Sequence, residues 1–251
     1  SRKYFDSSMR YFLQLSYHGE KFCGWQRQEN ALSVQEVLED NLSKIFSSEI
    51  SIIGCGRTDA GVHAQDYYAH FDSEQLIPDN FLYRINRMLP NSVAIHRIFE
   101  TAPNKHARFD ATRRTYKYFV HLQKNPFLDD RSFQIHEWQP DIDKMNNCIQ
   151  QLLGEHDFST FEKKGSDNKT SICLLEDAKW ERTEDGLVFT ITANRFLRNM
   201  VRRITAALLM VGLGKLNEQD VIHAVLNKES LDVKLAVPAK GLFLWKIEYH
   251  F

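Results

Sequence analysis

The chain has 251 residues, of which 43% are hydrophobic and 26% are charged, and its formal net charge is −1 at pH 7. These proportions are those of a soluble globular protein with one large domain or two of ordinary size. A membrane span is excluded because no apolar run approaches ~18 residues. The near-neutral charge gives no overall sign of nucleic-acid binding, so any basic surface must come from the distribution of charge.

The four cysteines, at positions 23, 55, 148 and 173, form no C-x-x-C pair and lie far apart. We therefore expect the reduced thiols of a cytoplasmic protein, and neither a zinc site nor a disulfide framework. No signal peptide is visible. Residues 1–8 are polar and irregular, and Met9 is a candidate for the native start, so this segment is left out of the fold prediction.

Hydrophobic patterning in the first half predicts strands and helices in the order β-α-β-β-α-β. Residues 11–17 alternate between apolar and polar, which is typical of a half-buried strand. The capping box Ser33-x-x-Glu36 then begins a helix that ends near Phe46. The remaining predictions are strands at 50–55, 65–72 and 92–99 and a helix near 79–89.

The second half repeats this order with one further helix before its last strand. It predicts strands at 114–122, 171–181, 187–193 and 242–249 and helices at 141–153, 195–211 and 218–227. Each half is thus a split βαβ, or ferredoxin-like, unit. We predict an α+β protein with halves 1–110 and 111–251, joined into one mainly antiparallel sheet. Helices are expected on one face of this sheet, and an RNA-binding cleft on the other.

The segment from Gly54 to Ala64 packs three glycines, an arginine and an aspartate into a predicted tight turn after a strand. A dinucleotide-binding fingerprint does not fit, because its third glycine is replaced by Asp59 and a strand follows where a helix is needed. Asp59 either caps its own turn or has a chemical role. Arg57, two residues away, favours the chemical role because a nearby guanidinium keeps a carboxylate ionised.

Basic residues gather in two segments. Residues 105–117 hold five bases and one acid, and residues 194–203 hold four arginines and no acid. In the first segment Tyr116 and Tyr118 share one side of a strand, where they either stack on RNA bases or belong to the core. In the second, arginines spaced i, i+3 and i+7 on the predicted helix form either a solvated face or a site for phosphates or a carboxylate.

Metal binding is not expected. His63 and His70 follow Asp59 closely, but they straddle a turn and a strand, and no cysteine falls at ligand spacing.

Several of these motifs resemble the tRNA pseudouridine synthase A family, in the family's order and over roughly residues 11–249. They are Gly56–His63 around Asp59, Phe22–Gln28, Arg108–Thr112 with Tyr116–Tyr118, Leu153–Phe158, Phe196–Arg202 and Gly241–Leu244. His18 departs from the pattern, since the family usually has aspartate there, and the change concerns local loop or RNA contacts.

The resemblance implies that Asp59 is the catalytic residue and that Tyr116, and not Tyr118, is the active-site tyrosine. It further implies that Arg202 pairs with Asp59 and that Leu244 forms an apolar wall. The family acts on uridines 38 to 40 of the tRNA anticodon stem-loop, without cofactor or metal and as homodimers. Contacts with RNA are expected from Gln26, Arg27, Lys105, Arg108, Arg113, Arg114, Arg195 and Arg198.

The implied reaction breaks the N1–C1′ bond of uridine and rejoins the base through C5. An ionised Asp59 can trap the positive charge that develops on the sugar, or it can remove a sugar proton to give a glycal, and the sequence leaves both routes open. Two other functions also stay open. A non-catalytic RNA-binding module explains the tyrosines and bases but not Asp59, and a nucleoside hydrolase would use the same carboxylate.

Overall fold

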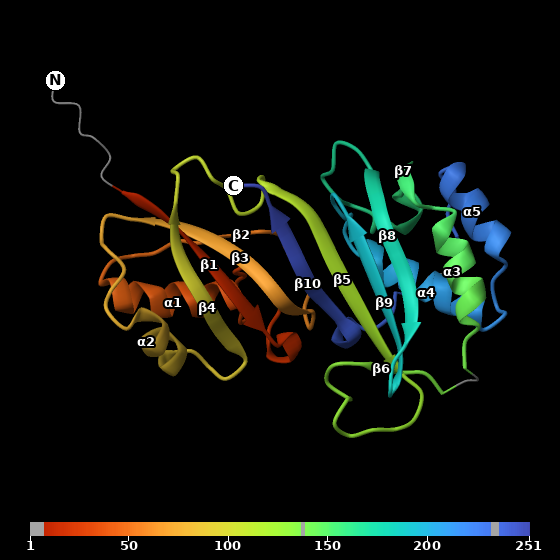
Figure 1. Ribbon diagram of the computed structural model, residues 1–251, viewed down its shortest axis with the longest axis horizontal. Coiled ribbons are helices and arrows are strands. Elements are labelled where there is room, and N and C mark those ends of the chain that lie inside the picture. Colours follow the sequence, from red (N-terminus) through yellow and green to blue (C-terminus); the bar gives the residue numbers. More distant parts are fainter. Residues whose placement is uncertain (1–7, 137–138, 232–235) are drawn as a thin grey trace. The chain divides into compact units, whose positions relative to one another are not determined.

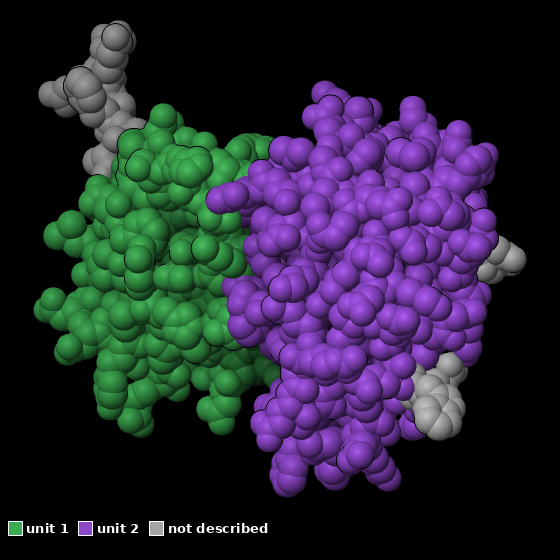
Figure 2. Space-filling model, turned by 45° about the vertical axis from the view of Figure 1, so that its right-hand side comes forward, with its two compact units in different colours: residues 1–112, 246–251 green, residues 113–245 purple. Residues whose placement is uncertain are grey.

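The computed structural model describes residues 8–136, 139–231 and 236–251 (Figure 1). The chain forms two compact units: unit 1 holds residues 1–112 and 246–251, and unit 2 holds residues 113–245 (Figure 2). The junction lies two residues beyond the predicted boundary at 110/111, and the last six residues return to unit 1. The division into independent domains stays a prediction.

Unit 1 has the predicted order of elements. They are β1 (Met9–Tyr17), α1 (Val34–Phe46), β2 (Ile53–Gly54), β3 (His63–Ser73), α2 (Phe81–Met88) and β4 (Val93–Thr101), with a 3-10 turn at Gly19–Lys21. The strand order is β4-β1-β3, and β2 pairs with β3. These pairings are antiparallel, so unit 1 has the 4-1-3-2 arrangement of a ferredoxin-like unit.

The two faces of the unit 1 sheet differ in what covers them. Odd-numbered residues of β1 point toward the helices, since the Tyr11 ring lies 6.3 Å from the ring of Phe46 in α1. The opposite face carries Phe12, which stacks between His70 and Phe99 at 5.5 and 5.8 Å. The alternation of side chains along a strand therefore assigns Tyr17 and Tyr67 to the helix side, because they share the face of Leu15.

Unit 2 contains more strands than the sequence predicts for this half. Its elements are most of β5 (Ala111–His121), β6 (Phe133–Gln134), α3 (Ile142–Gln150), β7 (Gly154–Asp157), β8 (Ile172–Arg182), β9 (Gly186–Ala193), α4 (Met200–Gly212), α5 (Glu218–Leu226) and the start of β10 (Leu242–Tyr249), with 3-10 turns at Ser159–Phe161 and Ala239–Gly241. The strand order is β10-β5-β9-β8-β7. In the described part of unit 2, β6 pairs parallel with β5, whereas the pairs β5–β9, β7–β8 and β8–β9 are antiparallel, so the predicted α+β class and mainly antiparallel pairing are confirmed.

The predicted helix at 195–211 is wrong at its start. α4 begins at Met200, because Asn199 has a left-handed backbone with φ 66° that no helix can contain. Arg195 and Arg198 therefore lie in the loop before the helix, and the expected i, i+3, i+7 stripe does not form.

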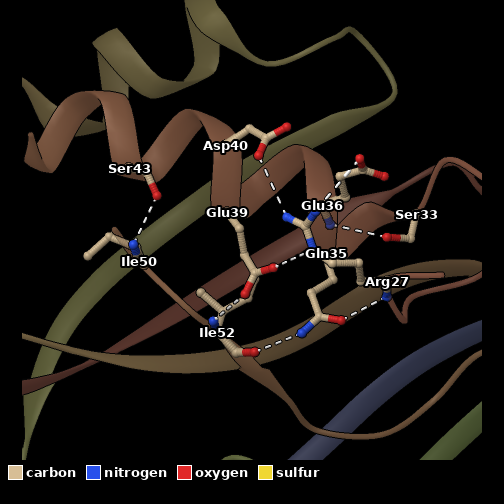
Figure 3. A network of polar contacts seen from close by, with 9 residues as sticks. All are labelled: Arg27, Ser33, Gln35, Glu36, Glu39, Asp40, Ser43, Ile50 and Ile52. Atoms are coloured by element: carbon tan, nitrogen blue, oxygen red, sulfur yellow. Dashed lines mark hydrogen bonds and ion pairs between the residues drawn. The ribbon is translucent and has the colours of Figure 1, made fainter. Parts of the chain in front are cut away.

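The predicted strand at 50–55 shrinks to the two residues of β2. The N–H groups of Ile50 and Ile52 bond instead to side chains of α1, at 2.9 Å to the Ser43 hydroxyl and 2.9 Å to the Glu39 carboxylate (Figure 3). Side chains thus replace a partner strand at this point.

Within the described residues, no helix is long and apolar enough to cross a membrane.

Candidate active site

Asp59 lies on the loop between β2 and β3 in unit 1. Its side chain is half-buried, and Arg57 is exposed. The loop turns at Gly61, which has φ 82°, and the N–H of Val62 donates to the Asp59 carbonyl at 3.1 Å. The backbone on both sides of the carboxylate is therefore fixed, while the carboxylate itself keeps access to solvent.

The segment at residues 18–28, which follows β1, contacts the Asp59 loop through its backbone. It is called the supporting segment below. The Trp25 N–H donates to the Thr58 carbonyl at 3.4 Å, and the Gly61 N–H donates to the Phe22 carbonyl at 3.3 Å. A Cβ on Gly24 would overlap the Thr58 carbonyl, and Gly24 has φ 87°. The predicted motif 22–28 therefore has a structural explanation: a glycine is needed there for two loops to touch.

His18 begins this supporting segment. Its Nδ1 accepts the N–H of Glu20 at 3.4 Å and so caps the 3-10 turn. An aspartate, which the family usually has at this position, can accept the same bond from the backbone N–H two residues on. Histidine therefore keeps the capping bond of the 3-10 turn.

Arg27 was expected to contact RNA, but its guanidinium lies among three carboxylates of α1 (Figure 3). It donates to Glu39 at 3.1 Å and lies 3.7 Å from Glu36 and 3.6 Å from Asp40. The Arg27 N–H also donates to the Gln35 side chain at 2.8 Å. These contacts fasten the supporting segment to α1, and a role for Arg27 in RNA binding stays a prediction.

Two tyrosines that the sequence did not single out reach the Asp59 loop. The Tyr17 hydroxyl bonds to the Thr58 hydroxyl at 2.6 Å, and the Tyr67 hydroxyl donates to the Gly56 carbonyl. One signal was available: a tyrosine at a buried strand position must find a partner for its hydroxyl.

The two histidines considered as metal ligands have separate backbone partners. His63 Nδ1 accepts the Gly19 N–H at 2.8 Å, and His70 Nδ1 accepts the Ala107 N–H at 3.0 Å. Burial lowers the pKa of His70 to about 4, so its ring is neutral at physiological pH.

In unit 2, the two tyrosines of β5 lie in different environments. Tyr118 is fully buried, its hydroxyl donates to the Pro238 carbonyl at 2.7 Å, and burial raises its pKa. Tyr116 is half-buried, and its ring meets the Phe196 ring edge-on at 5.0 Å. Both belong to the side of β5 that faces the core and helices, and not to the open face on which the sequence places the cleft.

Arg202, on the first turn of α4, is anchored within unit 2. Its Nε donates to the Val237 carbonyl at 2.9 Å, and a terminal nitrogen donates to the Asn199 side chain at 3.2 Å. Leu244 on β10 is buried. Asp59 belongs to unit 1, whereas Tyr116, Arg202 and Leu244 belong to unit 2, so their convergence on one site stays a prediction.

The other basic residues divide by their contacts. Arg195 donates to the carbonyls of Thr170 and Ile172, both at 2.9 Å, and so ties its loop to the start of β8. Arg113 pairs with Glu176 at 3.3 Å. Arg114 donates to the Asn194 carbonyl at 3.4 Å. The Lys105 ammonium lies 5.3 Å from the centre of the Phe251 ring. Gln26, Arg108 and Arg198 are exposed.

Comparison with known proteins agrees with the motifs. A family model described as tRNA pseudouridine synthase matches residues 15–110 and 148–250. Curated proteins of Azobacteroides pseudotrichonymphae and Parabacteroides distasonis, both named tRNA pseudouridine synthase A, are each 41% identical over 242 residues, which is 96% of this chain and 96% of theirs. The protein of the same name from Bacteroides fragilis is 41% identical over 246 residues, or 97% of each chain. Because the match runs nearly from end to end, the chain belongs to the tRNA pseudouridine synthase A family, whose members convert uridine to pseudouridine in tRNA.

Proposed function

We propose that this protein isomerises uridines 38 to 40 of the tRNA anticodon stem-loop and that Asp59 is its catalytic residue. One observation carries the assignment to Asp59: the residue lies on a turn whose backbone is held on both sides, while its carboxylate is only half-buried. A carboxylate held in this way is oriented before substrate arrives, which lowers the entropic part of the barrier.

The chemistry needs no redox step, since the base leaves C1′ through N1, which takes up a proton, and returns through C5, which loses its proton to solvent with the Tyr116 hydroxyl as the candidate for that transfer. Asp59 acts on the sugar, either by trapping the cation at C1′ or by removing a proton from C2′ to give a glycal. The detached uracil must be held while it turns. Tyr116 is the tyrosine suited to this because it is only half-buried, whereas Tyr118 is fully buried.

The proposal also includes the residues expected around Asp59 and Tyr116. Arg57 and Arg202 are the cations proposed to support Asp59 in the active site, Arg202 by pairing with it, and Leu244 is the proposed apolar wall. The substrate is a folded tRNA, and its target uridine must leave the helix at a cost of a few kcal/mol. The enzyme is proposed to work in the cytoplasm as a homodimer. Sedimentation at micromolar concentration should give twice the chain mass of 29.4 kDa, and a monomer would contradict the dimer.

The target positions can be tested with an unmodified tRNA transcript that has uridine at 38, 39 and 40. After incubation, carbodiimide adducts on pseudouridine are mapped by reverse transcription. We expect stops at these three positions and at no other uridine. Stops elsewhere would refute the proposed specificity. An unchanged transcript would favour a non-catalytic RNA-binding module, and release of free uracil would favour a nucleoside hydrolase.

A further inference from the structure

Two hydroxyl groups from the unit 1 sheet bond to the Asp59 loop, three residues and one residue before Asp59. Tyr67, on β3, donates its hydroxyl to the Gly56 carbonyl. Tyr17, the last residue of β1, bonds to the Thr58 hydroxyl at 2.6 Å. The two bonds thus fix the backbone three residues before Asp59 and the side chain immediately before it.

The rings that carry these hydroxyls are themselves immobilised. Trp25 stacks on Tyr67 with ring centroids 4.3 Å apart and planes inclined by 30°. Tyr17 meets the Tyr67 ring edge-on at 5.5 Å. A Cβ on Gly54 would overlap both the Tyr67 hydroxyl and the Trp25 ring, so a glycine is needed there for the tyrosine to reach the loop.

Neither tyrosine is placed to meet RNA. Tyr67 has 0% and Tyr17 has 4% of its surface exposed. Any effect of their hydroxyls on the reaction must therefore pass through the loop that they hold.

We propose that Tyr67 and Tyr17 are positioning residues that set the orientation of Asp59 through Gly56 and Thr58. This inference rests on the proposed catalytic role of Asp59. A displacement of a reacting group by about 1 Å can slow a reaction by about 100-fold, so loss of one of two anchoring bonds is expected to cost about tenfold in rate.

The test compares Tyr67→Phe with Tyr11→Phe on unmodified tRNA. Tyr11 is a matched control because it is buried in the same sheet and its hydroxyl also donates to a carbonyl, that of Gln75 at 3.0 Å. Both variants should lower the melting temperature by a similar few degrees. Only Tyr67→Phe should slow single-turnover pseudouridine formation about tenfold, with KM for tRNA changed less than twofold.

Tyr17→Phe provides an independent arm, since it releases Thr58 and leaves Gly56 held. It should show the same loss of rate at constant KM. Wild-type rates in both Tyr67→Phe and Tyr17→Phe, with Asp59→Asn inactive, would overturn the positioning role alone. Full activity of Asp59→Asn would instead overturn the proposed function, and the positioning role with it.

Discussion

Glu39 and Asp40 are adjacent acids on α1 that both face Arg27, yet their replacement by alanine should have very different effects on stability. The Glu39 side chain is 11% exposed and accepts bonds from Arg27 at 3.1 Å and from the Ile52 N–H at 2.9 Å. The Asp40 side chain is 63% exposed and lies 3.6 Å from Arg27. Of these two acids, Figure 3 draws a bond from Glu39, and none from Asp40, to the segment at 50–52 that leads into the Asp59 loop.

Glu39→Ala leaves the buried Ile52 N–H without its acceptor, which costs about 1–3 kcal/mol, and it removes a charge-assisted bond as well. Arg27 keeps Glu36 and Asp40 as neighbours, so no isolated charge is buried. We therefore expect a total loss of about 2–3 kcal/mol. Asp40→Ala removes a surface ion pair and should cost less than about 0.5 kcal/mol. Urea unfolding at 25 °C measures both values. A difference between the variants below about 1 kcal/mol would refute this account of the network.

Three further predictions concern tyrosine, charge and pH. Tyr116→Phe should slow turnover because it removes the hydroxyl proposed to transfer the C5 proton, whereas Tyr118→Phe should lower the free energy of unfolding by about 1 kcal/mol and leave kcat unchanged, and the reverse pattern would exchange their roles. Arg198→Gln should lower the slope of log tRNA affinity against log salt by about 1, as filter binding can show, and an unchanged slope would contradict a phosphate contact from this residue. Because the pKa of His70 is lowered from 6.5 to about 4, only the unfolded state takes up this proton between those values, so stability falls as pH falls. From pH 7 to 5 the loss from His70 is about 2 kcal/mol, and His70→Gln should remove it in urea titrations at the two pH values. An unchanged pH dependence in that variant would contradict a buried neutral ring.

Local patterns predicted most elements correctly because each of those elements follows one rule along the chain. The alternation at 11–17 gave β1, and the capping box at Ser33 gave the start of α1, where the Glu36 N–H does bond to the Ser33 hydroxyl at 3.1 Å. Elements that depend on a distant partner were missed. The apolar run at 50–53 predicts a longer strand, but its N–H groups bond to Glu39 and Ser43, which no periodicity reveals.

The site shows the same division between local and distant information. The glycine-rich turn around Asp59 could be predicted, since glycine and aspartate favour turns through local backbone conformation and local hydrogen bonds. The hydrogen bonds of Tyr17 and Tyr67 to this turn could not be predicted, because they join residues 41 and 11 positions apart in the chain. The charge pattern also did not reveal the partners of the arginines within the protein. Arg27 and Arg195 are held by acids and carbonyls that the charge pattern does not place beside them.

The central claim is that Asp59 drives isomerisation of uridine within tRNA. Its most direct test is unmodified tRNA carrying tritium at C5 of uridine, incubated with the wild-type protein, with Asp59→Asn and with Asp40→Asn as a control of equal charge. We predict release of tritium to water by the wild type and by Asp40→Asn, with the base retained in the RNA. Asp59→Asn should bind the tRNA and release none. Release by Asp59→Asn at the wild-type rate, or no release by a wild-type protein that binds the tRNA tightly, would contradict the claim.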